Sequence, residues 1–218
     1  MATITVKGTG KNRQAADQIE LGLDFKTVAL VYGEALQQAT QKIEAVQECL
    51  QGIGFQKNDI KTLNFDVSST YESYQTEQGN WQQRFVGYQV SQGVKLVFAF
   101  SPERLGEVIA AVADSKSQPE LTIAFTIADE TAFKEDLLQA AVKEAKKNAV
   151  ILATAASCQL GAIQAIHYDW TDVHFHSETN FAPRLMKASA AKSAIPDITP
   201  ADVKGQETVT CIWELVEK

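Results

Sequence analysis

Two histidines one residue apart, His174 and His176, have the only spacing in the sequence that is typical of metal ligands. Alternate residues of a β-strand point to one side, so two imidazoles at these positions could share an ion such as zinc. Nearby residues that could complete such a site are His167, Asp169 and Asp172. The alternative is a strand with two solvated histidines opposite a buried Val173 and Phe175. We favour it, because nothing in the sequence specifies the remaining ligands, and we predict no metal.

Other catalytic and cofactor motifs are absent from the sequence. Gly8-Thr9-Gly10 lacks the third glycine of a dinucleotide fingerprint, since position 13 is Arg, and a strand rather than a helix follows. The acidic pair Glu135–Asp136 is explained by a helix start, and no local signature supports a Cys–His nucleophile. Buried structural thiols are expected at Cys49, Cys158 and Cys211. We therefore predict no enzymatic activity and no cofactor.

Five aromatic residues gather around a segment that we expect to be a hairpin tip. They are Tyr71, Tyr74, Trp81, Phe85 and Tyr88. Aromatic side chains on a projecting element are common anchors of protein interfaces. The alternative is that Tyr71, Phe85 and Tyr88 form ordinary cross-strand pairs. The interface interpretation predicts a homo-oligomer or a protein partner rather than catalysis.

The elements that position these residues follow from the spacing of apolar side chains. Seven segments alternate apolar and polar residues, as half-buried strands do. These segments are residues 3–6, 19–25, 63–71, 86–100, 121–127, 166–175 and 209–215. A polar turn at 11–14 predicts a hairpin between the first two strands. The polar tip at 72–84 predicts a long protruding hairpin, in which Gly87 or Gly93 could hold a bulge.

Three segments have helical spacing instead. Apolar residues recur every three or four positions from Leu36 to Ile53, which fits a helix on a sheet as well as a coiled-coil seam. Ser101-Pro102-Glu103 is a strong helix start, and Asp129-Glu130 begins an Ala-rich helix. The face of that helix consists of Phe133, Leu137, Ala141, Ala145, Ala149, Leu152 and Ala156. Small residues allow close approach to another backbone.

Together these segments predict an α+β protein with a mainly antiparallel sheet or sheets, about seven strands and three helices. Residues 178–202 are rich in Ala, Ser, Pro and Lys and are expected to form a long loop. We expect two packed lobes, one made of about 1–70 with 160–218 and the other of about 71–159.

Composition and charge exclude several classes of protein. The 218 residues carry 20 Lys and Arg against 27 Asp and Glu, a net charge of −7 that disfavours nucleic-acid binding. No stretch approaches the roughly 20 apolar residues that span a bilayer, so we expect no membrane span. No signal peptide is visible, which predicts a cytoplasmic protein as written. A periplasmic protein whose signal peptide was removed would look the same.

The order of several short motifs resembles that of the SIMPL-domain family, once called a domain of unknown function. The motifs are Ile4-x-Val6-x-Gly8-x-Gly10, Asp17, Ala35, Ile53-Gly54, Asp59-Ile60-x-Thr62, Tyr71, Gly87-Tyr88, Phe125-x-Ile127-x-Asp129, Ala141, Ala145, Ala149, Leu160-Gly161, Pro200 and Val209. The family includes bacterial periplasmic immunogenic proteins and a eukaryotic kinase-associated signalling protein. The resemblance covers essentially all of 1–218 as a single unit.

The resemblance implies an α+β fold of two packed lobes and, in some members, rings or higher oligomers. It implies no established enzyme activity, cofactor or catalytic residue. Bacterial relatives are linked to the cell envelope and to oxidative-stress tolerance, so a stress-related role is one expectation. Our first hypothesis is a non-enzymatic interaction or self-assembling protein that uses the predicted hairpin. The second is a small-molecule or metal-binding protein, or an enzyme, with its site near His174 and His176.

Overall fold

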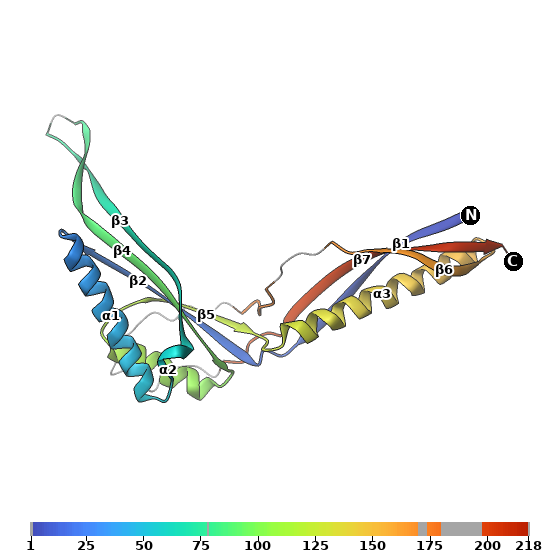
Figure 1. Ribbon diagram of the computed structural model, residues 1–218, viewed down its shortest axis with the longest axis horizontal. Helices are drawn as coiled ribbons and strands as arrows, with labels where there is room; N and C mark the ends of the chain where they lie inside the picture. Colours follow the sequence, from blue (N-terminus) through green and yellow to red (C-terminus); the bar gives the residue numbers. More distant parts are fainter. Residues whose placement is uncertain (1, 78, 170–173, 180–197, 218) are drawn as a thin grey trace. The chain divides into compact units, whose positions relative to one another are not determined.

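The computed structural model describes residues 2–77, 79–169, 174–179 and 198–217. In these residues the chain forms three α-helices and seven strands in two sheets, which confirms the α+β prediction (Figure 1). The helices are α1 (Tyr32–Gly52), α2 (Pro102–Asp114) and α3 (Glu130–Ala155), with a short 3-10 helix η1 (Lys57–Asp59). The strands are β1 (Ala2–Gln14), β2 (Gln18–Ala29), β3 (Ile60–Gln75), β4 (Trp81–Ala99), β5 (Glu120–Thr126), β6 (Cys158–His167) and β7 (Val203–Glu217).

The chain divides into two compact units. The first consists of Met1–Asp17, Phe125–Glu178 and Pro200–Lys218, and the second of Gln18–Ala124 and Thr179–Thr199. These boundaries differ from the expected lobes of 1–70 with 160–218 and 71–159. Two causes contribute. The helix α3 packs on the sheet that contains β1 and β7. In addition, β1 pairs with the distant β7, whereas β2 pairs with β4, so the chain changes unit between its first two strands. The predicted hairpin between these strands is therefore wrong.

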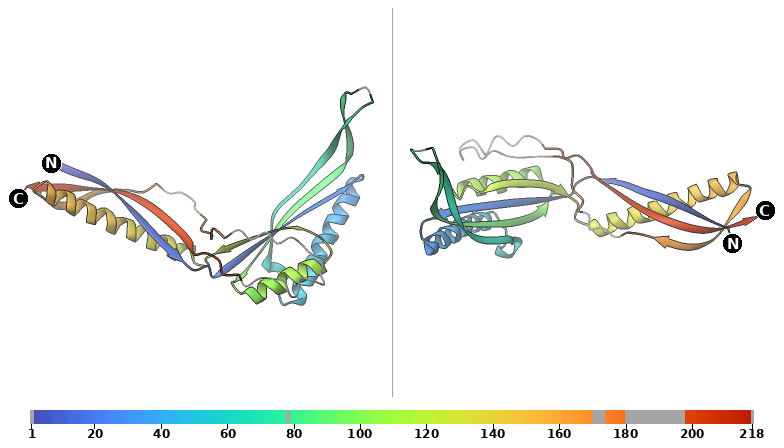
Figure 2. Two further views of the ribbon diagram at one scale, coloured as in Figure 1. Left: turned by 180° about the vertical axis from the view of Figure 1, so that it is seen from behind. Right: turned by 90° about the horizontal axis from the view of Figure 1, so that it is seen from above.

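In the first unit, α3 packs on one face of a three-stranded antiparallel sheet of order β1-β7-β6 (Figure 2). Gly8 and Gly10 of β1 face this helix, and a β-carbon at either position would overlap the helix backbone. The small side chains of Ala141 and Ala145 complete the close approach, together with the buried Val6. Gly8 and Gly10 thus let the backbones of β1 and α3 come into contact.

The buried stripe of α3 repeats every four residues. It consists of Phe133, Leu137, Ala141, Ala145, Ala149 and Ala153. A spacing of four drifts around a helix of 3.6 residues per turn, so the stripe follows the twist of the strands beneath it. The predicted face therefore fails at its end, where Leu152 is 51% exposed and Ala156 lies beyond the helix.

In the second unit, β3, β4, β2 and β5 form a four-stranded sheet in that order. The side of β2 that bears Ile19, Leu21 and Leu23 is almost completely buried. The buried face of α1, which includes Ala35 and Ala39, packs on Val90 of this sheet. This contact confirms that the segment with helical spacing is a helix packed on a sheet. As predicted, Ser101 caps the start of α2, and its hydroxyl accepts a hydrogen bond from the backbone N–H of Arg104.

The predicted long hairpin is present and consists of β3 and β4 (Figures 1 and 2). The pairing of β4 with β2 ends at Tyr88, so residues 81–87 of β4 pair with β3 alone among the described strands. A shift of register lies beside Gly87, whose φ of +144° suits glycine. A second shift lies near Gly93. The hairpin therefore extends past the end of β2.

One prediction near the C-terminus needs correction, and another falls mostly on residues that the structure does not describe. The strand predicted for residues 166–175 begins earlier, because β6 extends from Cys158 to His167. Its expected members Trp170 and Val173 lie outside the described residues, as does most of the predicted 178–202 loop. Residues 198–202 carry neither helix nor strand. Across the described part of the chain, no helix is long and apolar enough to cross a membrane.

Candidate interaction surface

Four aromatic rings form a continuous row at the base of the hairpin. Tyr71 and Phe85 lie opposite each other on β3 and β4, with ring centroids 5.7 Å apart. Phe85 packs on Tyr88 at 5.3 Å, and Tyr88 packs on Tyr32, the first residue of α1, at 5.5 Å. All three contacts are edge-to-face, the arrangement that aromatic pairs prefer. We call Tyr32, Tyr88, Phe85 and Tyr71 the aromatic row.

The row packs against itself and still leaves much of its surface exposed. Tyr71 is 57% exposed, Tyr32 50% and Phe85 41%, while Tyr88 is half-buried. Cross-strand pairing alone, the alternative interpretation, accounts for the contacts between rings. It does not account for the large aromatic area that remains in contact with water.

The pairing register divides the five predicted aromatic residues between the two faces of the hairpin. Opposite residues share a face, and alternate residues along a strand do as well. Trp81 pairs with Gln75 and therefore shares the face of Tyr71 and Phe85, where it is 72% exposed. Tyr74 pairs with Gln82 and lies on the other face. The structure thus brings four of the five to one face and separates Tyr74 from them.

The face that holds Tyr74 is polar. The guanidinium of Arg84 lies 2.8 Å from the carboxylate of Glu72 and 5.8 Å from the centre of the Tyr74 ring. The hydrogen bond with Glu72 and the charge of that carboxylate raise the pKa of Arg84. The Tyr74 hydroxyl also donates to the side-chain oxygen of Gln82 at 2.9 Å. One face of the ribbon is therefore ionic and hydrogen-bonded, and the other carries Tyr71, Phe85 and Trp81.

Three residues of this surface were missed by the sequence reasoning. Leu30, Val31 and Tyr32 join β2 to α1 and are 68%, 55% and 50% exposed. Five apolar residues in succession, 28–32, at the junction of a strand and a helix are the signal that could have revealed them. Connecting segments are normally polar, so such a run indicates contact with something other than water.

The histidine pair flanks a core phenylalanine, and Asp172, one of the candidate ligands near it, lies outside the described residues. His174 and His176 are exposed on either side of the buried Phe175, whose ring packs on Phe133 at 4.9 Å. His176 forms a single bridge to Thr126 rather than part of a longer strand. Within the described ranges, no three His, Cys, Asp or Glu side chains gather closely enough to hold an ion. The arrangement agrees with solvated histidines around a core phenylalanine.

The three cysteines are free thiols in different surroundings. Cys211 of β7 is fully buried against α3, as predicted, and burial raises the pKa of its thiol. Cys49 of α1 and Cys158 of β6 are partly exposed, so the expectation of core positions is wrong for these two.

Comparison with known proteins identifies one family. The family model described as SIMPL, protein of unknown function (DUF541), matches residues 4–213. No curated protein matches the chain.

Proposed function

The chain belongs to the SIMPL family of proteins of unknown function, and from this premise we propose that it is a non-enzymatic protein that associates with further copies of itself. The aromatic row, together with Trp81, is the surface that joins the copies. The stress-related role and the location that the family resemblance implies stay predictions.

The observation that carries this proposal is the exposed aromatic face of the hairpin. Its rings are held in place by one another before any partner binds, so association costs little side-chain entropy. Tyr and Trp are the residues that most often dominate binding energy at interfaces. Exposed Leu30 and Val31 extend the apolar area beside Tyr32.

A second copy is the occupant that the geometry favours. Beyond Tyr88 the hairpin is a two-stranded ribbon that carries Tyr71, Phe85 and Trp81 on one face, and such a ribbon is only marginally stable when uncovered. Another copy carries the same face, so a two-fold arrangement would cover both ribbons at once. In that arrangement Trp81 of each chain would lie over the aromatic row of the other.

Sedimentation velocity or light scattering across a wide range of protein concentration tests the proposal. The wild type should show concentration-dependent assembly, and the double variant Tyr71→Ser with Trp81→Ser should shift the association midpoint at least tenfold. Tyr74→Ser is the matched control, because it removes an exposed tyrosine from the other face of the same ribbon. Far-ultraviolet circular dichroism establishes that each variant is folded.

Two results would overturn the proposal. The first is a wild-type monomer at every concentration, and the second is equal dissociation by Tyr74→Ser. A monomer that captures a different protein through Tyr71 and Trp81 would show that the same surface serves a foreign partner instead of a second copy.

A further inference from the structure

The sheet of the first unit has a face opposite α3 that no described helix or strand covers, and we call it the open face. The residues of β1 that face the helix are buried, as Val6 and Gly10 are, and the residues between them point the other way. Lys11 and Arg13 lie on that open face. On the neighbouring β7, Lys204 and Gln206 share it, because they pair with Arg13 and Lys11 respectively. Four polar side chains, three of them cationic, thus lie on this face at one end of the sheet.

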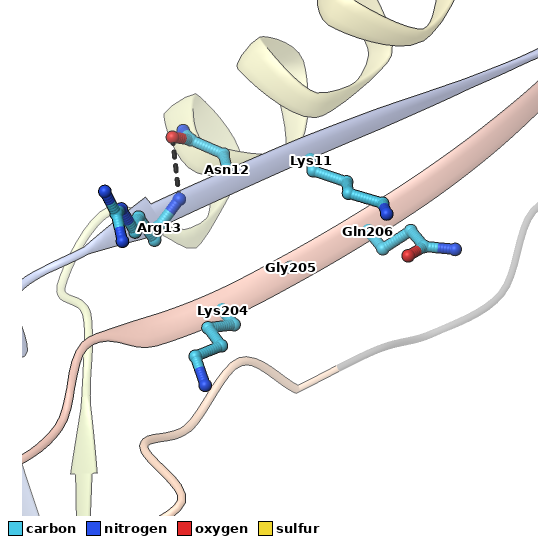
Figure 3. A pocket seen from close by; sticks show the side chains of 6 residues that line it. All are labelled: Lys11, Asn12, Arg13, Lys204, Gly205 and Gln206. Atoms are coloured by element: carbon cyan, nitrogen blue, oxygen red, sulfur yellow. Dashed lines mark hydrogen bonds between the residues drawn. The ribbon is translucent and has the colours of Figure 1, made fainter.

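These side chains line a hollow of about 670 Å³ (Figure 3). Figure 3 shows Lys11 and Gln206 extending beside each other from neighbouring strands, with Lys204 further along β7. The amide of Asn12 is turned back to the chain, where its oxygen accepts from the backbone N–H of Arg13 at 2.8 Å. The hollow therefore presents ammonium, guanidinium and amide donors.

The charge in the hollow is unbalanced. Arg13 and Lys204 lie directly opposite each other, and like charges at opposite positions destabilise a strand pair. Lys204 contacts the carboxylate of Glu178 at 3.1 Å, but the ammonium of Lys11 and the guanidinium of Arg13 form no ion pair with any described residue. Three cations against one carboxylate leave an excess of two positive charges. This excess occurs in a chain whose net charge is −7.

We propose that this basic hollow binds a phosphate group, held by Lys11, Arg13 and Lys204. A phosphate carries about −1.5 to −2 charges at neutral pH, which matches the excess of two positive charges. The planar guanidinium of Arg13 suits two oxygens of one phosphate, while the lysines act as point charges. Gln206 adds a neutral donor from its amide nitrogen. A single carboxylate, with one negative charge, would neutralise only half of the excess.

Isothermal titration calorimetry with inorganic phosphate and pyrophosphate tests this site on the full chain at low ionic strength. Saturable binding is expected at one site per chain, and the variants Lys11→Gln and Arg13→Gln should each weaken it about tenfold or more, since a charge-assisted hydrogen bond is lost. Lys7→Gln is the matched control, because Lys7 lies on the same open face of β1, about 13 Å from Lys11 along the strand. It should leave binding unchanged.

Three outcomes would overturn the proposal. They are no saturable heat with either anion, the same heat from sodium chloride at matched ionic strength, and equal weakening by Lys7→Gln. Tight citrate binding without phosphate binding would assign the hollow to carboxylates and likewise overturn it.

Thermal unfolding without added anion distinguishes a binding role of Arg13 from a structural one. A residue that only stabilises the fold would lower the melting temperature when it is replaced. Arg13→Gln relieves a like-charge pair, so the melting temperature without anion should stay equal or rise, and the stabilisation by pyrophosphate should become smaller. A fall of the melting temperature in the absence of anion would contradict the proposal. These measurements concern residues of the first unit, so their outcome is independent of the assembly proposed for the hairpin of the second.

Discussion

Tyr32 and Tyr88 pack edge-to-face, with ring centroids 5.5 Å apart and ring planes at 87°. Tyr32 is the first residue of α1, and Tyr88 is the first residue of β4 that pairs with β2. The contact therefore joins the start of a helix to the point at which the hairpin leaves the sheet. The exposed residues Tyr71, Phe85 and Trp81 lie further along the hairpin from this contact.

Loss of the Tyr32 ring should loosen the base of the hairpin. Tyr32→Ala is expected to lower the free energy of unfolding by about 0.5–1.5 kcal/mol beyond the loss of buried area, because an edge-to-face pair is removed. Amide hydrogen exchange in residues 81–88 should accelerate. Chemical denaturation and exchange mass spectrometry measure the two effects. Tyr32→Phe keeps the ring and should behave as wild type, and a loss as large as that of Tyr32→Ala would show that the hydroxyl matters instead.

A β-carbon at Gly10 should separate β1 from α3. It would overlap the carbonyl group of Leu137, and this obstacle is backbone that cannot rotate away. Gly10→Ala is therefore expected to cost about 1–3 kcal/mol of stability, or more, as overpacked cores do. Urea denaturation measures the change.

Gly33 supplies the control for this substitution. It lies in the first turn of α1 with no atom within 4 Å of an added β-carbon. Gly33→Ala should leave stability unchanged or raise it by up to about 1 kcal/mol, the usual difference between the two residues in a helix. Equal effects of the two substitutions would refute the close approach of β1 to α3.

The three thiols should react in two classes. Cys49 and Cys158 are partly exposed, whereas Cys211 is fully buried, so a disulfide reagent should modify two thiols per native chain and the third only in denaturant. Cys211→Ala should leave the native count at two. A native count of three, or a loss from that count on Cys211→Ala, would contradict the burial.

Burial raises the pKa of the Cys211 thiol, which sets the sign of a pH effect. Above the ordinary thiol pKa the unfolded chain releases this proton while the folded chain keeps it. Stability is therefore retained below that pH and falls as pH rises through it. Cys211→Ala should reduce this alkaline loss, which denaturation at several pH values measures.

Much of the fold follows from local patterns. The helix start at Ser101 and the alternation in β2 and β4 are correct because capping and the period of buried side chains are short-range properties. The pairing of one strand with another is not a short-range property. The polar turn after residue 10 suggested that β1 and β2 form a hairpin, yet β1 pairs with β7 nearly 200 residues away. Alternation shows that a residue lies on a strand, and it carries no information about the neighbour.

The candidate surface, too, could be predicted from the sequence only in part. Aromatic residues around a hairpin were visible in the sequence, and so were the positions of Tyr71 and Trp81 on either side of the tip. Their shared face was not, because it depends on the register of pairing and on the shift beside Gly87. Tyr32 joined the row only in the folded chain, since more than 50 residues separate it from Phe85 and Tyr88.

The sequence by itself determined the fold class, the helices and the family, because each depends on residue types at short spacing. Tertiary structure alone decided that Arg13 faces Lys204, that Gly10 touches Leu137 and that Tyr74 lies apart from Tyr71. Each of these relationships joins segments that are remote in the chain or depends on the register between two strands. Such contacts form only when the whole sheet and its helix bury their apolar faces together.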